Sequence, residues 1–257
     1  MNKTVQRLVV INKEIINEDN FILSLKSPVP LANVLAGQFL SINVEKSKDV
    51  FLRRPFSIHD VHLESNSLDV LIKTVGPGSS ALKEVEVGDE LDTIYPLGNS
   101  FTMPKKDEKV LLVGGGVGIA PMLYLAKELK PYTSNVNILL GSRKGSDQIL
   151  LDRYEKVGTV FTTTEDGTVG EKGYVTDHSF MKEHLGEIDH IYCCGPEPMM
   201  KSIAKLTASE GVDCEVSLEN MMGCGFGVCL CCVTDTQAGH KCVCSDGPIF
   251  NTSDLKW

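Results

Sequence analysis

The sequence predicts a multidomain α+β and α/β protein: an N-terminal antiparallel β-barrel, a central doubly wound parallel α/β sheet and a small C-terminal cysteine-rich segment. Three observations support this fold class. Short strand-like runs fill the first hundred residues, apolar runs alternate with helix-like stripes from Val110 onward, and six of the nine cysteines fall between Cys224 and Cys244. The expected domain boundaries are 1–103, 104–216 and 217–257.

The first hundred residues consist of short apolar runs that Gly, Pro and Asn interrupt at turn-like intervals. This spacing is typical of a small antiparallel barrel. The expected strands are Leu8–Ile11, Phe21–Leu25, Gln38–Val44, Leu68–Val75 and Glu90–Tyr95. The polar run 105–109 follows and is a plausible domain boundary.

The middle of the chain alternates between apolar strands and amphipathic helices. Val110–Val113 is short and wholly apolar, as expected of a buried parallel strand. A stripe at i, i+3, i+4 and i+7 begins at Met122 and predicts a helix. Further strands are expected at Val136–Leu140, Thr159–Thr163 and Ile191–Cys194, and further helices at Asp147–Lys156 and Glu197–Ser209. This alternation indicates a doubly wound sheet.

Composition limits the classes of function. The formal net charge is −9 and no basic stripe is present, which argues against nucleic acid and against an anionic membrane as partners. The N-terminal apolar run is too short for a signal peptide, and no run approaches the ~18 apolar residues of a membrane helix. Cysteines crowded together in such a chain indicate metal binding in a reducing cytoplasm.

The cysteine spacing suggests a specific metal group. Cys224, Cys229 and Cys232 form C-x4-C-x2-C, and Cys244 supplies a fourth thiol. Plant-type ferredoxins hold a [2Fe–2S] cluster with this spacing. The alternatives are structural zinc, which usually takes two C-x2-C pairs, and a patch of cysteines that bind no metal. Cys231, Cys242 and the loop residue His240 are expected to be bystanders.

Two glycine-bearing turns follow predicted parallel strands. Gly115, Gly116 and Gly118 lie between an apolar strand and an amphipathic helix, as a phosphate-binding turn requires. Cys194 and Gly195 end a later strand, so both turns are expected to face one crevice beyond the strand ends. The third glycine of G-x-G-x-x-G is missing, and a tight turn without a ligand remains the alternative for each.

A further motif lies within the barrel half: Arg54, Pro55, Phe56 and Ser57, preceded by Arg53. Arginine can clamp a pyrophosphate, a serine hydroxyl can bind polar flavin atoms, and an aromatic ring can lie against a flavin. Taken alone, the run favours a strand that carries a solvated basic pair over a flavin site.

Together, Arg-Pro-Phe-Ser, Gly-Gly-Gly-x-Gly-x-Ala-Pro and Cys-Gly-Pro resemble the ferredoxin–NADP reductase superfamily over about residues 1–215. With the cysteine tail and Cys244-Ser-Asp-Gly-Pro, nearly the whole chain resembles the electron-transfer subunit of dihydroorotate dehydrogenase B. The resemblance implies FAD in the barrel, NAD in the α/β domain and a C-terminal [2Fe–2S] cluster. The chain departs from it at Met221, where members often carry an arginine.

The resemblance also implies residue roles. Arg54 would contact an FAD phosphate, and Phe56 and Ser57 would lie at the flavin, with Pro55 between them. The second FAD segment would be Gly78, Ser79 and Ser80. The nicotinamide nucleotide would meet Gly115, Gly116 and Gly118, with Cys194 and Gly195 closer to its reactive end. No catalytic acid or base is expected.

Electron counting gives the expected order of transfer. A nicotinamide exchanges a hydride and a cluster exchanges single electrons, so a flavin must connect them. The chain has no room for the ~250-residue TIM barrel that oxidises dihydroorotate in the family. The resemblance therefore implies an FMN-containing catalytic partner, a heterotetramer, orotate as product and NAD+ as final acceptor in pyrimidine biosynthesis.

Three alternatives remain open at this point. The first is the small subunit of an NAD(P)H-linked ferredoxin or sulfide oxidoreductase, the second a cluster-based redox sensor, and the third a zinc-stabilised flavin reductase. The run 142–144 is compatible with either NAD or NADP, and the sequence leaves the cluster potential, the oligomeric state and the role of Trp257 open.

Overall fold

The computed structural model describes residues 3–31, 33–47 and 49–257. The chain forms two compact units, each assembled from segments that are not contiguous in sequence. The first comprises Met1–Ser100, Glu219–Thr234 and Lys241–Pro248, and the second comprises Phe101–Leu218, Asp235–His240 and Ile249–Trp257.

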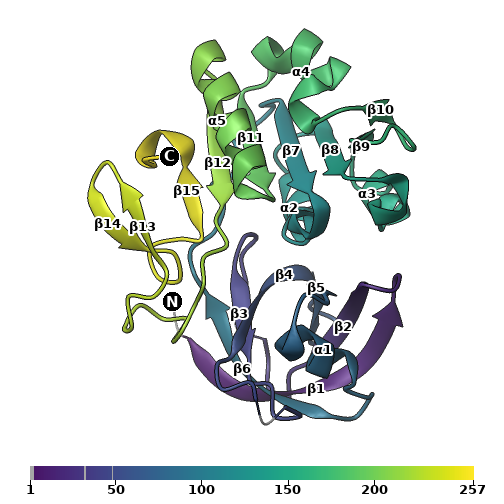
Figure 1. Cartoon of the computed structure of the whole chain (residues 1–257), viewed down its shortest axis with the longest axis vertical. Coiled ribbons are helices and arrows are strands. Elements are labelled where there is room, and N and C mark those ends of the chain that lie inside the picture. Colours follow the sequence, from purple (N-terminus) through teal and green to yellow (C-terminus); the bar gives the residue numbers. More distant parts are fainter. Residues whose placement is uncertain (1–2, 32, 48) are drawn as a thin grey trace. The chain divides into compact units, whose positions relative to one another are not determined.

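The first unit is a closed antiparallel barrel with the strand order β1-β2-β5-β4-β3-β6 (Figure 1). Its core consists of inward-facing apolar side chains such as Leu8, Phe21, Leu40 and Ile58, all of which are fully buried. The strands are β1 (Thr4–Ile15), β2 (Asn20–Lys26), β3 (Phe39–Ile42), β4 (Arg54–His62), β5 (Ser67–Lys73) and β6 (Glu90–Leu97), and α1 (Pro77–Lys83) connects the last two. The predicted barrel is confirmed.

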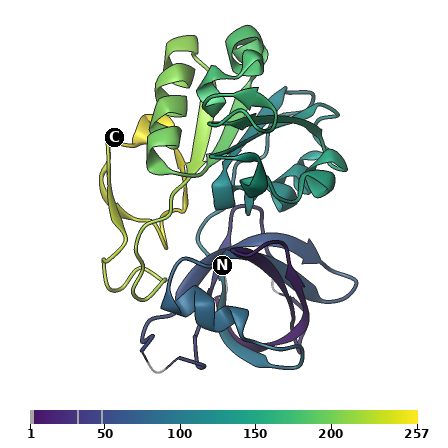
Figure 2. The same ribbon diagram turned by 45° about the vertical axis from the view of Figure 1, so that its right-hand side comes forward.

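The second unit is a seven-stranded sheet in which β7 is central (Figures 1 and 2). The chain builds β8 and β9 on one side of β7 and then β11 and β12 on the other, which is the doubly wound arrangement that was predicted. In order across the sheet the strands are β10 (Glu171–Lys172), β9 (Thr159–Thr164), β8 (Val136–Ser142), β7 (Val110–Gly115), β11 (His190–Cys194), β12 (Asp213–Ser217) and β15 (Ile249–Asn251).

Helices accompany this sheet. The predicted stripe of α2 is confirmed, because all four of its apolar members are buried. The α-helices are α2 (Met122–Leu129), α3 (Leu151–Glu155), α4 (Ser179–His184) and α5 (Glu197–Glu210). Single 3-10 turns are η1 (Gly116–Ile119), η2 (Gly145–Asp147), η3 (Val175–Asp177), η4 (Leu185–Glu187) and η5 (Thr252–Asp254).

One predicted helix is much shorter than expected. The pattern from 147 to 156 predicts a continuous helix, but Leu150 has a φ of 61°, in the left-handed region. An L-residue in that conformation cannot continue a right-handed helix. The segment therefore splits into η2 and the short α3.

The cysteine-rich tail contributes to both units. β13 (Val233–Thr236) and β14 (Gly239–Cys242) form a two-stranded sheet. β15 joins the second unit by pairing antiparallel with β12. In the first unit the amide of Asn99 donates to the carbonyl of Gly247 over 2.7 Å, and a Cβ on Gly98 would lie 2.4 Å from Pro248.

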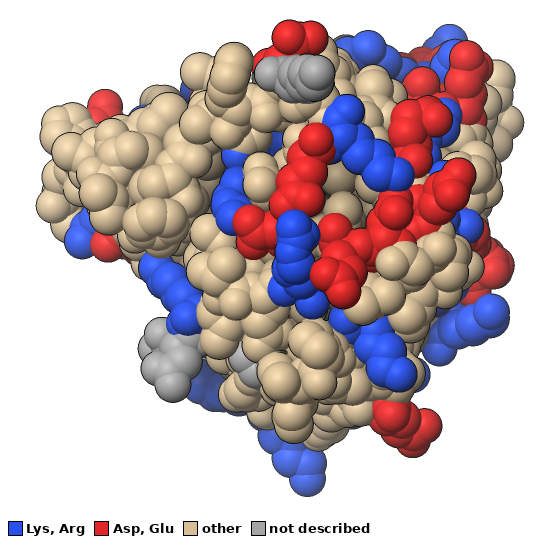
Figure 3. Space-filling view, turned by 90° about the horizontal axis from the view of Figure 1, so that it is seen from below, with Lys and Arg blue, Asp and Glu red and all other residues tan. Residues whose placement is uncertain are grey.

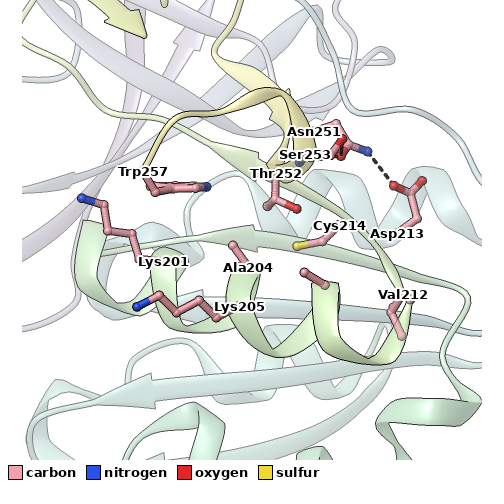
Figure 4. A pocket seen from close by; sticks show the side chains of 12 residues that line it. Lys201, Ala204, Lys205, Val212, Asp213, Cys214, Asn251, Thr252, Ser253 and Trp257 are labelled. Atoms are coloured by element: carbon pink, nitrogen blue, oxygen red, sulfur yellow. Dashed lines mark hydrogen bonds between the residues drawn. The ribbon is translucent and has the colours of Figure 1, made fainter. Parts of the chain in front are cut away.

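The surface carries charges of both signs. Figure 3 shows Lys and Arg interspersed with Asp and Glu over the face it presents. Exposed pairs such as Arg7–Glu45, 2.9 Å apart, are worth at most about 1 kcal/mol each. Within the described ranges, no helix combines the length and apolar character needed to traverse a bilayer.

Candidate cluster, flavin and nicotinamide sites

The four predicted cluster ligands lie in one compact unit. Cys224, Cys229 and Cys232 belong to the loop between β12 and β13, and Cys244 follows β14. Cys232 and Cys244 are buried, whereas Cys229 is exposed. All nine cysteines of the chain are free thiols.

Backbone N–H groups point at these sulfur atoms. The Sγ of Cys224 accepts from Phe226, Val228 and Cys229 at 3.4–3.5 Å, and Gly227 donates to the Sγ of Cys244 over 3.0 Å. The glycines of the loop allow this wrapping: Gly225 and Gly227 have φ values of 81° and 90°, which residues with a Cβ rarely adopt.

The sulfurs are arranged as two pairs, and each pair also makes backbone contacts. The amide of Cys224 donates to Cys229 Sγ over 3.3 Å, and the amide of Cys244 donates to Cys232 Sγ over 3.4 Å. Four thiols in two pairs with amide donors match the ligand set of a [2Fe–2S] cluster. The residues present therefore fit the predicted group.

Electrostatics differ between the two pairs. Burial alone raises the pKa of Cys224, but the N–H donors of Phe226, Cys229 and Val228 bring it down to about 6. At Cys244 burial dominates and, with neighbouring Cys232, raises the pKa to about 12. Backbone donors thus stabilise the thiolate at the exposed end of the loop, as iron ligation requires.

The three residues that are expected not to bind the cluster, Cys231, Cys242 and His240, have surroundings that differ from those of the predicted ligands. Cys231 is exposed, and Cys242 is the last residue of β14, where its amide donates to the carboxylate of Asp246 over 2.8 Å. His240 is exposed in the β13–β14 hairpin and pairs with Asp235.

The first flavin segment opens strand β4, and the structure brings it beside the second. Arg54, Pro55, Phe56 and Ser57 are all half-buried. A Cβ on Gly78 would lie only 2.7 Å from Nε of Arg54, so the arginine stem packs directly on the first turn of α1. A half-buried arginine beside a glycine, whose backbone carries no side chain, forms a site that can accommodate a phosphate.

The two serines of the second segment differ. Ser79 is buried, and its Oγ accepts N–H groups from Val75 and Gly76 at 2.9 and 3.2 Å. That hydroxyl therefore caps α1, whereas Ser80 is exposed. Arg53, which the motif also contains, forms an ion pair with Asp92 instead.

The two nicotinamide turns meet at the ends of the adjacent strands β7 and β11. A Cβ on Gly118 would lie 2.5 Å from the carbonyl oxygen of Cys194, and one on Gly195 would lie 3.0 Å from Cα of Gly115. The glycines therefore let the two turns pack closely at the switch point of the sheet, where Gly116 and Gly195 remain half-buried. Between Gly115 and α2, however, the chain makes the extra turn η1, where Gly116 has a φ of 56°.

Sequence reasoning missed the contact of the cluster loop with the barrel. A Cβ on Gly225 would lie 3.6 Å from Leu97 and 3.9 Å from Ser41, which belong to β6 and β3. Ser41 in turn pairs with Pro55 of the flavin segment across β3 and β4. Nothing in the local sequence indicates this contact, because Gly225 lies 128 residues after Leu97 and 184 residues after Ser41.

An antiparallel barrel, a doubly wound sheet with glycine turns and a four-thiol loop define an iron–sulfur flavoprotein of the ferredoxin-reductase type. Family models match in the same order: an oxidoreductase FAD-binding domain at 7–102, an oxidoreductase NAD-binding domain at 112–205, and the iron–sulfur cluster binding domain of dihydroorotate dehydrogenase B at 219–256. The chain belongs to the family of electron transfer subunits of dihydroorotate dehydrogenase B (NAD(+)).

Individual relatives support this assignment. The electron transfer subunit from Caldanaerobacter subterraneus subsp. tengcongensis is 41% identical over 83% of this chain and 84% of its own. The one from Shouchella clausii is 33% identical over 99% of each chain. Among solved structures, an NADH-dependent reduced ferredoxin-NADP oxidoreductase has a TM-score of 0.86 and 32% identity, covering 97% of this chain and 90% of its own.

Proposed function

We propose that this chain carries electrons from an FMN-containing dihydroorotate dehydrogenase subunit to NAD+, so that the partner converts dihydroorotate to orotate in pyrimidine biosynthesis. The names of the relatives support a catalytic partner. We also propose the cytoplasm as the compartment, which the nine free thiols support, and a heterotetramer as the assembly.

The observation that carries the proposal is the path from the cluster loop to the flavin segment. Gly225 of the loop lies against Ser41, and Ser41 is the cross-strand neighbour of Pro55. Neighbouring strands are about 4.8 Å apart, so one strand spacing separates the loop contact from the flavin motif. Short separation is what electron exchange between two bound redox groups needs.

Residue roles follow from this geometry. We propose that the flavin is held by Arg54, Pro55, Phe56, Ser57, Gly78, Ser79 and Ser80, the nicotinamide by Gly115, Gly116, Gly118, Cys194 and Gly195, and the cluster by Cys224, Cys229, Cys232 and Cys244. When bound, a flavin exchanges both hydride and single electrons and so connects a nicotinamide with a one-electron cluster. The protein's part is to hold the arginine beside Gly78 and to aim N–H groups at the sulfurs.

The isolated chain tests the division of labour. We expect the purified protein to reduce artificial acceptors with NADH but to show no dihydroorotate turnover, because oxidation of dihydroorotate in the family requires a TIM-barrel domain of about 250 residues on a second chain. Turnover should appear only with the co-expressed catalytic partner. Substantial turnover by the single chain, measured as orotate formation, would overturn the proposal.

The solved ferredoxin-NADP oxidoreductase relative favours a second candidate, a subunit that exchanges electrons with NADP and ferredoxin. Co-purification distinguishes the two. The first candidate requires an FMN-bearing partner that oxidises dihydroorotate, and the second requires a partner that reacts with NADP.

The cluster loop also offers a surface for the partner. Met221, Phe226, Val228 and Leu230 are all exposed, Leu230 to 63%, and Leu230 has a φ of 57°. An apolar side chain that is both exposed and held in a left-handed conformation costs stability in the free subunit. We propose that the catalytic subunit covers this apolar loop.

Leu230→Asp should therefore prevent assembly with the partner. A buried unpaired carboxylate in the interface is expected to weaken association by about 2–5 kcal/mol, while NADH-driven reduction of artificial acceptors is unchanged. Size-exclusion chromatography of the co-expressed pair measures the effect. The matched control is Leu63→Asp in the turn between β4 and β5, where Leu63 is 80% exposed. Equal assembly of the two variants would refute this docking surface.

A further inference from the structure

A polar cluster on the barrel lies outside the three redox sites. Asp60 and His62 belong to β4 and Asp69 to β5. One ligand-type atom from each lies within 4.8 Å of the others. The Nε2 of His62 lies 3.0 Å from Oδ2 of Asp69 and 3.8 Å from Oδ2 of Asp60.

A strand irregularity creates this arrangement. Ile58 pairs with Val70, but the next pair is Asp60 with Asp69, because the register shifts between Ile58 and Asp60. Adjacent residues of a strand face opposite sides of the sheet, so Asp69 lies on the side opposite to Val70. A bulge re-aims the residues that follow it and here sets Asp60 directly across from Asp69.

The two carboxylates are buried, which is unusual for a like-charged pair. Asp60 is 4% exposed and Asp69 is 7% exposed. Like charges directly opposite each other in an antiparallel sheet are destabilising. Within the described part of the chain, Oδ1 of Asp69 is buried and accepts no hydrogen bond, and the ion pair of Asp69 is with His62. A buried carboxylate oxygen without a donor calls for a cation.

We propose that Asp60, His62 and Asp69 bind a divalent transition cation, Zn²⁺ above all. Zinc binds imidazole nitrogen and carboxylate oxygen at about 2.0–2.2 Å in tetrahedral geometry, so its ligand atoms lie about 3.4 Å apart. The separations of 3.0 and 3.8 Å bracket that value. An imidazole ligand favours zinc over Mg²⁺ or Ca²⁺, and three protein ligands leave a fourth position for water.

The cation would fix strand β4 to strand β5. β4 begins with Arg54 and ends with His62, so the site is at the opposite end of the strand that carries the flavin segment. The ion would offset the repulsion between the two facing carboxylates. Bidentate binding by Asp69 would also give its Oδ1 a partner.

Zinc titration of the full-length holoprotein tests the site. After treatment with a chelator, calorimetry with ZnCl₂ should detect a site in the wild type whose dissociation constant rises by at least about 10-fold in Asp69→Asn and in His62→Gln. His184→Gln is the matched control, because His184 is exposed and pairs with a single carboxylate, Glu187, at 3.1 Å. It should bind zinc as the wild type does. Unchanged zinc affinity in Asp69→Asn, or no zinc binding by the wild type, overturns the proposal.

Thermal unfolding gives a second, independent readout. Zinc should raise the unfolding temperature of the wild type but not of Asp69→Asn. Without metal, Asp69→Asn should be at least as stable as the wild type, because the substitution removes the repulsion between facing carboxylates. If the metal-free variant is instead less stable and zinc leaves the wild type unchanged, His62 holds the carboxylates through its own polar contacts and the site is not a metal site. Neither result bears on electron transfer, which NADH oxidation measures separately.

Discussion

Cys229→Ala is expected to abolish electron delivery to the catalytic partner while NADH still reduces the flavin. Cys229 is an exposed thiol whose Sγ accepts the amide of Cys224, and its removal leaves three ligands for a cluster that needs four. The loss of partner-dependent turnover should exceed the roughly 10–100-fold loss that follows removal of a residue hydrogen-bonded to a metal ligand. Iron and acid-labile sulfide content, partner-dependent turnover and NADH reduction of artificial acceptors measure it.

Cys231→Ala is the matched control for this variant. Cys231 is exposed, lies two residues away and is an expected bystander. It should keep its iron, its sulfide and full partner-dependent activity. If Cys231→Ala loses the cluster and Cys229→Ala keeps it, the ligand assignment is wrong.

Arg54→Ala should yield protein that is purified largely without FAD. The arginine is half-buried and packs on Gly78 at the first turn of α1. A charge-assisted hydrogen bond to a phosphate contributes about 1.5–3 kcal/mol, so the dissociation constant of FAD should rise about 10–100-fold. Flavin content after dialysis and fluorescence titration with FAD measure the effect.

Two further variants distinguish a role of Arg54 in FAD binding from a general effect on the barrel. Arg53→Ala removes a neighbouring arginine that is paired with Asp92 and should leave FAD affinity unchanged. Gly78→Ala keeps Arg54 but should displace it, because the new Cβ would lie 2.7 Å from its Nε. Weaker FAD binding in Arg53→Ala than in Arg54→Ala would contradict the proposed role.

The sequence predicts the secondary structure where burial follows a simple period. The apolar run at 110–113 and the stripe that starts at Met122 both lie in the elements expected of them, β7 and α2. The sequence indicates β4 only at its start, where the run at 53–57 taken alone favours a strand, because His59 and Asp60 interrupt the apolar pattern farther along. The expected helix from 147 breaks at Leu150, whose left-handed backbone no propensity would indicate.

The spacing of residues in the sequence predicts the cluster ligands, but not the contacts that surround them. The cysteine spacing points to a cluster because ligand geometry restricts the intervals between neighbouring ligands. Contacts between distant segments carry no such signal, so Gly225 against Ser41 and Arg54 against Gly78 required the folded chain. The motif assigns Ser79 to the flavin, whereas the structure shows that its hydroxyl also caps α1. The motif alone does not indicate this second contact.

The proposed function depends on four thiols that hold a [2Fe–2S] cluster and on electron exchange between that cluster and the flavin of the same chain. The most direct measurement is EPR and metal analysis of anaerobically prepared protein before and after one addition of NADH. We expect about two irons and two acid-labile sulfides per chain, and the EPR signal of a reduced cluster once NADH is added. Protein that lacks iron and sulfide even after reconstitution, or a cluster that NADH leaves oxidised in FAD-loaded protein, would contradict it.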